Sequence, residues 1–393
     1  MNSLPRILYV LHDNIKNAGG TEHHTMTLLS GLDNCYDTWV VYPDGNKLCV
    51  SNDGEECMTG PAEPFSPLIP PYCSTVIDQS FGKLLLNLRP DIIHIQHFLR
   101  WPLNIIDLAI QSKIPTVLSI HDYYVITPEY ILHKDRDPCE PLTPDNSIKR
   151  YGEDISVYLN KRRDILASSM RRVSRLVVPS EFVRQTLNKV FPNECTVIPH
   201  GIPPSPRRPK RSNSEKLAFG CAGNLVPSKG WEQLLEAFLS LRKQHPNTEL
   251  HFFGEIQSEY KLQQVNNPAS RYFGEHTPGV IYHGGYDASS IYDLFSLVDV
   301  LVIPSLTAET YSLVLSEAWM AGLPVAVSDI GALGARVVDG INGKKFVAGN
   351  IGSIKETLTW FVENDSWKSW EIKKPRTSAE MLEDYDQLYK ELL

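Results

Sequence analysis

The sequence predicts an α/β protein with two doubly wound domains, because short apolar runs alternate with helical patterns twice along the chain. The first series of strand patterns covers residues 6–11, 39–42, 91–95, 116–120, 175–178 and 196–198, and the second covers 217–221, 248–253, 280–283, 299–303 and 324–327. Residues 199–211 contain five prolines and separate the two series, which predicts an interdomain linker. At 393 residues the chain also exceeds the usual size of a single hydrophobic core.

Helical patterns lie between these strands and set the domain boundaries. They cover residues 21–32, 103–111, 154–176, 180–190, 230–244 and 378–393, whereas 43–75 shows no periodicity and predicts loops with at most a hairpin. We expect a first domain at 1–200, a linker at 201–212, a second domain at 213–372, and a segment 373–393 whose helix crosses back to the first domain. Two such domains facing each other would form a cleft lined by strand ends, where α/β proteins bind ligands.

Composition and charge narrow the class of protein. The hydrophobic content of 42% and charged content of 21% are ordinary for a globular protein, and no apolar stretch approaches the ~20 residues of a membrane span. Seven cysteines without a C-x-x-C pair disfavour a disulfide framework or a structural zinc site, so we expect a cytoplasmic protein. The net charge of −8 argues against nucleic acid as a partner.

Positive charge is concentrated between Lys149 and Arg211, where fourteen Lys or Arg residues stand against five Asp or Glu. The helix predicted over 154–176 has an apolar side, and its other side carries Lys161, Arg171, Arg172 and Arg175. This basic helix has two interpretations: an ordinary solvated surface, or a site for anionic lipid or a polyanionic acceptor. The second interpretation predicts peripheral contact with the inner face of a membrane.

The most informative segment covers residues 309–325 and carries two carboxylates, Glu309 and Glu317, eight positions apart. Glu309 follows a predicted strand and precedes a helix that contains Glu317 and stops at Gly322. The carboxyl end of a strand beside a helix N-terminus favours anionic ligands. The segment therefore predicts a phosphate-bearing ligand with hydroxyl groups that the carboxylates bind.

Glycine-containing loops form the first strand-to-helix connection of each half. Gly19 and Gly20 open the first helix, and the second loop runs from Gly223 and Asn224 to Lys229. Such glycines let backbone amides approach a phosphate, and the lysine would neutralise a diphosphate. Ordinary turns and a solvent-exposed lysine are the alternative interpretation. Neither loop contains G-x-G-x-x-G, which disfavours a nicotinamide-dependent dehydrogenase.

Histidines are the remaining candidate functional residues. His121 ends the strand pattern 116–120 and is either structural or directed into the predicted cleft. Other histidines raise the question of a metal ion, namely His12, His23, His24, His94 and His97. Their spacing is not a standard zinc pattern, and the set that the sequence leaves open as metal ligands is His23, His24, His94 and His97. Two Asp-x-Asp triplets, 135–137 and 384–386, are interpreted as chance occurrences. We therefore expect no metal site.

Taken in order, these motifs resemble the retaining, GT-B-fold glycosyltransferases of family 4 (glycosyl transferases group 1). The resembling segments are 6–10, 19–20, 88–95, 114–123, 178–182, 199–202, 223–230, 309–325 and 339–343, which span nearly the whole chain. The resemblance implies that a nucleotide-diphosphate sugar donates its sugar with retention at the anomeric carbon, without a metal ion or other cofactor. The implied acceptor is a saccharide or a lipid-linked saccharide, in surface polysaccharide or glycan biosynthesis.

The resemblance also implies a role for individual residues. Glu309 would hold hydroxyls of the donor sugar, Glu317 would bind the ribose, Lys229 would stabilise the leaving diphosphate, and His121 would lie near the reacting sugar. His121, Lys229 and Glu309 are thus the catalytic candidates. The expected donor-binding residues are Gly19, Gly20, Gly223, Asn224, Lys229, Glu309, Thr310, Tyr311, Ser312, Leu313 and Glu317.

Two positions depart from the family's pattern. Asn224 stands where the family usually has arginine, which removes a charge-assisted contact worth about 1.5–3 kcal/mol. Candidates for a substitute cation are Lys261, Arg271 and His283. Ser312 replaces a frequent glycine, and we expect it to be tolerated because serine suits a helix start. Because Asn224 lacks the usual positive charge, one alternative function is a catalytically weak protein that binds sugar nucleotides as a partner in a transferase complex. The other alternative is a sugar-nucleotide epimerase or a phosphorylase on the same fold.

Overall fold

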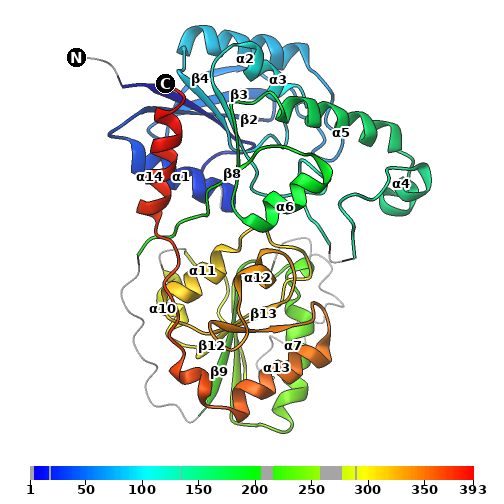
Figure 1. Cartoon of the computed structure of the whole chain (residues 1–393), viewed down its shortest axis with the longest axis vertical. Helices are drawn as coiled ribbons and strands as arrows, with labels where there is room; N and C mark the ends of the chain where they lie inside the picture. Colours follow the sequence, from blue (N-terminus) through cyan, green and yellow to red (C-terminus); the bar gives the residue numbers. More distant parts are fainter. Residues whose placement is uncertain (1–3, 17–18, 134, 205–215, 257–276, 288–289) are drawn as a thin grey trace. The chain divides into compact units, whose positions relative to one another are not determined.

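The computed structural model describes residues 4–16, 19–133, 135–204, 216–256, 277–287 and 290–393 (Figure 1). The chain divides into two compact units. The first comprises Met1–Leu132, Arg136–His200 and Ser378–Leu393, and the second comprises His133–Asp135 and Gly201–Thr377. Each unit contains one β-sheet with helices packed on it, so the prediction of an α/β protein with two Rossmann-like domains is confirmed.

The first unit is built on an eight-stranded sheet in the order β4-β3-β2-β1-β5-β6-β7-β8. Its parallel strands are β1 (Arg6–Val10), β2 (Asp37–Asp44), β5 (Ile92–Ile95), β6 (Thr116–Ser119), β7 (Arg175–Val178) and β8 (Thr196–Val197). Helices α1 (Gly20–Leu32), α2 (Thr75–Leu88), α3 (Ile105–Gln111), α4 (Pro144–Tyr151), α5 (Ser156–Met170) and α6 (Glu181–Val190) connect or follow them. Side chains of a strand alternate between faces, and in β1 Leu8 and Val10 enter one buried cluster while Ile7 and Tyr9 enter another. The sheet is therefore covered on both faces.

Residues 43–61, in the first half of the segment predicted as loops with at most a hairpin, form strands, and these include the hairpin that the prediction allowed. Strand β2 continues to Asp44 and is followed by two antiparallel neighbours, β3 (Lys47–Asn52) and β4 (Glu55–Pro61). Asp53 and Gly54 connect β3 to β4, with φ angles of 49° and 78°. Asp-Gly is a strong hairpin signal because it accepts positive φ at both turn positions. The Asp53-Gly54 turn was therefore recognisable in the sequence, although the strands on either side of it show no hydrophobic periodicity.

The second unit has a six-stranded, parallel sheet in the order β11-β10-β9-β12-β13-β14. Its strands are β9 (Leu217–Ala222), β10 (Thr248–Phe253), β11 (Val280–Tyr282), β12 (Val300–Ile303), β13 (Val325–Ser328) and β14 (Gly343–Phe346). Its α-helices are α7 (Trp231–Arg242), α10 (Ile291–Phe295), α11 (Leu313–Met320), α12 (Gly331–Arg336) and α13 (Ile351–Glu363). The strand order reverses between β9 and β12, and ligands of open α/β sheets bind at such a switch point.

The last helix, α14 (Ser378–Lys390), belongs to the first unit and packs beside α1 (Figure 1). Its Tyr389 is fully buried, with its hydroxyl 2.6 Å from Nδ1 of His94 and 3.2 Å from the hydroxyl of Tyr9. Tyr36 donates a hydrogen bond of 2.8 Å to Asp386 on the same helix. The chain therefore returns to its first unit after completing the second. Most of the linker predicted at 201–212 lies outside the described residues.

The basic helix predicted at 154–176 is shorter in the structure. Helix α5 ends at Met170, so Arg171, Arg172 and Arg175 do not lie on a helical face. Arg172 pairs with Asp107, and Arg175 with Glu391 at 3.4 Å. The continuous basic face inferred from helical spacing is therefore absent from this part of the chain. None of the helices among the described residues combines the length and apolar composition needed to span a bilayer.

Candidate functional site

The sequence-predicted donor residues of the second unit gather at the switch point of its sheet. Strands β9 and β12 are neighbours, and the loop after each carries one charged candidate, Lys229 and Glu309. Nζ of Lys229 lies 2.6 Å from Oε1 of Glu309, and the hydroxyl of Ser305 donates to the same oxygen at 2.7 Å. Two residues 80 positions apart in sequence therefore form one ion pair at the carboxyl edge of the sheet.

Two glycines make this arrangement possible. Gly230 has a φ of 69°, and a Cβ there would lie 2.0 Å from the carbonyl oxygen of Pro304, at the end of β12. Gly331 has a φ of 62°, and a Cβ there would lie within 3 Å of the backbone around Glu309. Only glycine fits both restrictions at each position. The two loops are thus fixed against each other by close backbone approach, which sets the positions of Lys229 and Glu309.

Glu309 carries a negative charge in this environment. Burial would raise the pKa of its carboxyl, but the charge of Lys229 and the hydrogen bonds from Lys229 and Ser305 outweigh burial and hold the pKa below its usual range. A partly buried, ionised carboxylate beside a lysine is a strong hydrogen-bond acceptor. This pair can exchange partners with a ligand that carries both an anionic group and hydroxyls.

The start of α11 lies directly after Glu309 and is conformationally unusual. Ser312 precedes the helix with a φ of 68° and a ψ of 94°, and its side chain makes no capping hydrogen bond. The expectation that serine is tolerated because it caps the helix is therefore wrong. Positive φ favours glycine at this position, which gives a physical reason for a glycine there. The first-turn amides of α11, beginning at Leu313, therefore receive no hydrogen bond from a capping side chain at Ser312.

Glu317 lies on the first turns of α11 and differs from Glu309 in charge. Burial raises the pKa of its carboxyl to about 7. The partly buried rings of Tyr286 and Tyr292 lie in the same hydrophobic region, and burial together with the carboxylate of Glu317 raises the pKa of both phenols. Glu317 therefore exchanges a proton near neutral pH, whereas Glu309 stays ionised.

Arg336 was missed at the sequence level. It is the last residue of α12, and its guanidinium donates to the carbonyl oxygens of Tyr311 at 2.6 Å and Ser312 at 3.2 Å, and to the hydroxyl of Ser316 at 2.7 Å. The guanidinium carbon also lies 3.9 Å from the centre of the Tyr311 ring. Arg336 thus holds the segment that follows Glu309. No local motif marks it, because it is 24 residues from Ser312 in sequence.

Asn224 is exposed in the loop after β9. One candidate for a substitute cation, His283, accepts or donates a 3.0 Å hydrogen bond to His251, and burial lowers the pKa of its imidazole. His283 is therefore not a permanent cation. The other two candidates, Lys261 and Arg271, lie outside the described residues.

In the first unit, Gly19 and Gly20 are exposed at the start of α1. A Cβ on Gly19 would collide with the carboxylate of the buried Glu22, whereas one on Gly20 would meet nothing within 4 Å. His121 follows β6, and its Nε2 lies 2.7 Å from Oε1 of Gln96. Burial and the neighbouring histidines hold the pKa of His121 well below its usual range, so the ring is neutral at pH 7.

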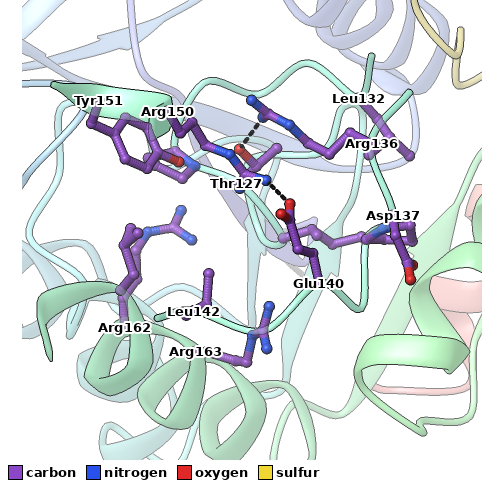
Figure 2. A pocket seen from close by; sticks show the side chains of 14 residues that line it. Thr127, Leu132, Arg136, Asp137, Glu140, Leu142, Arg150, Tyr151, Arg162 and Arg163 are labelled. Carbon is purple, nitrogen blue, oxygen red and sulfur yellow. Dashed lines mark hydrogen bonds and ion pairs between the residues drawn. The ribbon is translucent and has the colours of Figure 1, made fainter. Parts of the chain in front are cut away.

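A separate pocket is lined by the 126–142 loop and by helices α4 and α5 (Figure 2). Arg136 pairs with Glu129 at 3.2 Å, and Arg150 pairs with Glu140. The other two arginines of the lining, Arg162 and Arg163, form no ion pair within the described residues, and the Nε of each is buried without a hydrogen-bond partner there. Arg162 is 2% exposed, so its charge lies almost entirely inside the protein. The pocket therefore has surplus positive charge and unsatisfied donors.

Comparison with known proteins places the chain in a family. The family described as Glycosyl transferases group 1 matches residues 205–377, and that described as Glycosyltransferase Family 4 matches residues 18–206. Together the two matches cover both units of the fold. The chain belongs to the group 1, family 4 glycosyltransferases.

Individual relatives are distant. A glycogen synthase of Mycobacterium tuberculosis is 28% identical over 263 residues, which cover 62% of this chain and 60% of that protein. A lipopolysaccharide 1,2-N-acetylglucosaminetransferase of Salmonella typhimurium is 25% identical over 182 residues, which cover 43% of this chain and 48% of that protein. The matched part is thus about 60% of the first relative's length and less of the second's.

Solved structures share the fold over the whole chain. A sucrose-phosphate synthase of Thermosynechococcus elongatus has a TM-score of 0.69 at 14% identity, covering 99% of each chain. Anabaena HepE in complex with UDP and glucose has a TM-score of 0.66 at 14% identity, covering 98% of this chain and 99% of that one. Both comparisons support the GT-B architecture.

Proposed function

We propose that this chain transfers a sugar from a nucleoside-diphosphate sugar to a hydroxyl group of a saccharide or lipid-linked saccharide, with retention at the anomeric carbon. The ion pair of Lys229 and Glu309 at the switch point is the observation that carries the proposal. The lysine supplies positive charge for a diphosphate leaving group, and the ionised carboxylate accepts hydrogen bonds from hydroxyls of the donor sugar. Glu317 is the proposed ribose-binding carboxylate.

The diphosphate is proposed to bind between Lys229 and the start of α11. The proposed contacts there come from Thr310, Tyr311, Ser312 and Leu313, with Gly223 and Asn224 contributed by the loop after β9. The first-turn amides of α11 receive no side-chain cap, and a helix N-terminus attracts an anion. Binding would replace the Lys229–Glu309 ion pair with a lysine–phosphate contact, which releases the carboxylate for the sugar.

In the proposed reaction, the bond between the anomeric carbon and the diphosphate oxygen breaks, and its electron pair leaves with the diphosphate. The acceptor oxygen forms the new bond on the same face of the sugar, and its proton passes to the departing phosphate oxygen. Lys229 and the α11 amides stabilise the developing charge, so the proposed reaction requires no metal ion. His121 is the third proposed catalytic residue, and Gly19 and Gly20 are proposed to admit the diphosphate or the acceptor.

We propose the arginine-lined pocket of the first unit as a contact for an anionic part of the acceptor. The buried Arg162, which donates to the carbonyl oxygen of Tyr124, and the partly buried Arg163 have no ion-pair partner in the described residues, and arginine binds phosphate and carboxylate in a bidentate manner. The glycogen and lipopolysaccharide enzymes among the relatives support a saccharide as the acceptor. Cytoplasmic location and peripheral membrane contact stay predictions.

A transfer assay with UDP-, GDP- and ADP-sugars tests the proposal, with product analysis by NMR to read the anomeric configuration. We expect one donor class to be used, and expect Lys229→Ala, Glu309→Ala and His121→Ala each to lower kcat at least about 100-fold without loss of fold. The matched control is Lys216→Ala, which removes a 2.8 Å ion pair with Glu249 at the opposite, amino end of β9. Wild-type turnover in all three site variants contradicts the proposal.

The exposed Asn224 favours one alternative, a catalytically weak sugar-nucleotide-binding partner of a transferase complex. Calorimetric binding of a nucleoside diphosphate without turnover of any donor supports that alternative. An Asn224→Arg variant sharpens the comparison, because a restored cation should raise diphosphate affinity in either case but should raise turnover only in an enzyme.

A further inference from the structure

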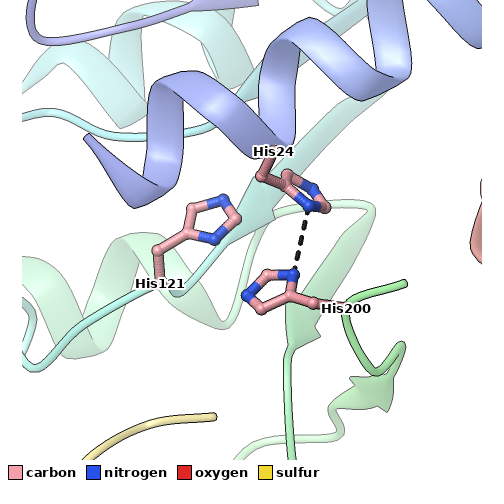
Figure 3. Close-up of side chains that lie close together, drawn as sticks. All are labelled: His24, His121 and His200. Carbon is pink, nitrogen blue, oxygen red and sulfur yellow. Dashed lines mark hydrogen bonds between the residues drawn. The ribbon is translucent and has the colours of Figure 1, made fainter. Parts of the chain in front are cut away.

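Three histidines from separate parts of the first unit lie together (Figure 3). His24 is on α1, His121 follows β6, and His200 follows β8. Each histidine offers one ring nitrogen as a metal ligand, and these three nitrogens lie within 4.8 Å of one another. Among the described residues this is the cluster of metal-ligating side chains, and it differs from the set His23, His24, His94 and His97 that the sequence suggested. His94 instead bonds to Tyr389, and His97 to Asp122 at 3.0 Å.

The geometry of the cluster is close to that of a three-histidine metal site. Zn–N bonds of about 2.0–2.1 Å place two ligand nitrogens of a tetrahedral site about 3.3 Å apart. Nδ1 of His24 and Nδ1 of His200 are 3.1 Å apart. The ligand nitrogen of His121 lies within 4.8 Å of the other two, so it would have to move by at most about 1.5 Å to complete the set.

The surroundings also suit metal ligands. Gln96 Oε1 lies 2.7 Å from Nε2 of His121 and can accept its proton, which leaves the lone pair of that ring on Nδ1. His24 is 4% exposed, and its Nε2 is buried without a hydrogen-bond partner in the described residues.

We propose that His24, His121 and His200 bind a transition-metal ion of the Zn²⁺, Co²⁺ or Ni²⁺ class. Imidazole nitrogens suit these ions, and three histidines with one open position are a known zinc arrangement. The site is not required for the proposed reaction. Because it uses His121, occupation by the metal inhibits transfer, and this last consequence rests on the proposed function.

Binding is tested directly on the full chain without a histidine tag and without nucleotide. Co²⁺ titration followed by visible absorption should give tetrahedral d–d bands that saturate at one equivalent, and Zn²⁺ should displace Co²⁺ with the same stoichiometry. His24→Gln and His200→Gln should each weaken Zn²⁺ binding by about tenfold or more. His23→Gln is the matched control, because His23 neighbours His24 on α1 but is exposed. Circular dichroism melting checks that each variant is folded.

The outcomes separate this inference from the proposed function. Absence of a saturable one-equivalent site, or equal Zn²⁺ affinity in wild type, His24→Gln and His200→Gln, overturns the metal site whatever the transfer assay shows. If transfer is detected, saturating Zn²⁺ should inhibit wild type and chelation should restore it, whereas His200→Gln should need at least about tenfold more Zn²⁺ for the same inhibition. If wild type and His200→Gln are inhibited at the same Zn²⁺ concentration, the proposed inhibition of transfer through the histidine site is overturned.

Discussion

Replacing Glu317 with glutamine should change how the stability of the ligand-free protein depends on pH. Burial raises the pKa of this carboxyl in the folded protein from an ordinary 4.5 to about 7. The unfolded chain therefore releases the proton at lower pH than the folded chain does. The contribution of the Glu317 carboxyl to the free energy of unfolding is fully present below pH about 4.5, and it is lost as the pH rises through about 7.

The size of the effect follows from the shift. Each pKa unit corresponds to about 1.4 kcal/mol, so ionising Glu317 in the folded protein costs about 3 kcal/mol once the pH exceeds 7. Most of this cost, about 2.5 kcal/mol, appears between pH 5 and pH 8. Glutamine has no proton to lose. The difference in melting temperature between Glu317→Gln and wild type should therefore grow by about 5–10 °C over that range.

Circular dichroism melting at pH 5, 6, 7 and 8 without nucleotide measures this difference. The control is Glu356→Gln, which changes an exposed glutamate of α13 and should leave the pH dependence as in wild type. A difference between Glu317→Gln and wild type that stays constant from pH 5 to pH 8 would refute the reasoning, since it would mean that Glu317 titrates alike in the folded and unfolded chain.

Three further substitutions test the backbone and contacts around the site. Ser312→Gly should raise the free energy of unfolding by about 1 kcal/mol, because glycine relieves the strain of the positive φ. Ser312→Ala keeps the strain and should show no gain in a melting experiment; equal melting temperatures of the glycine and alanine variants would contradict this reasoning. Gly230→Ala should lower the free energy of unfolding by at least about 3 kcal/mol and reduce nucleotide binding, because its Cβ would collide with a carbonyl oxygen 2.0 Å away. Gly322→Ala is also at positive φ but has nothing within 4 Å of its Cβ, so it should cost only about 1–2 kcal/mol. Similar losses of stability in the two variants would contradict the close approach at Gly230. Arg336→Lys should weaken nucleoside-diphosphate binding about tenfold in calorimetry, since lysine cannot form the same three hydrogen bonds and ring contact; unchanged affinity would show that Arg336 does not position the loop.

The parallel strands were predictable because they are buried on both faces. Residues 92–95 and 300–303, for example, are entirely buried, so the sequence shows continuous apolar runs bounded by turns. The edge strand β4 was not predictable in this way, since its burial is slight and only the Asp53-Gly54 turn marks it. Hydrophobic patterning reports burial and says little about exposed strands.

The candidate site was predictable where motif and strand end coincide. Glu309 and Lys229 each lie in the loop that follows a recognisable strand, and adjacent strands bring these loops together. Arg336 and the histidine cluster depend on pairings between distant segments, such as His24 with His200 across 176 positions. The strain at Ser312 depends on a backbone angle that the residue type does not indicate. These features appear only when the chain is folded.

The central claim is that Lys229 binds the diphosphate of the donor. Isothermal titration of wild type and Lys229→Ala with UDP and UMP, GDP and GMP, and ADP and AMP tests it most directly. For the preferred base, the lysine variant should lose about 10- to 100-fold in affinity for the diphosphate, as expected for a charge-assisted contact of 1.5–3 kcal/mol, and much less for the monophosphate. An unchanged diphosphate affinity, or an equal loss for both nucleotides, would contradict the claim.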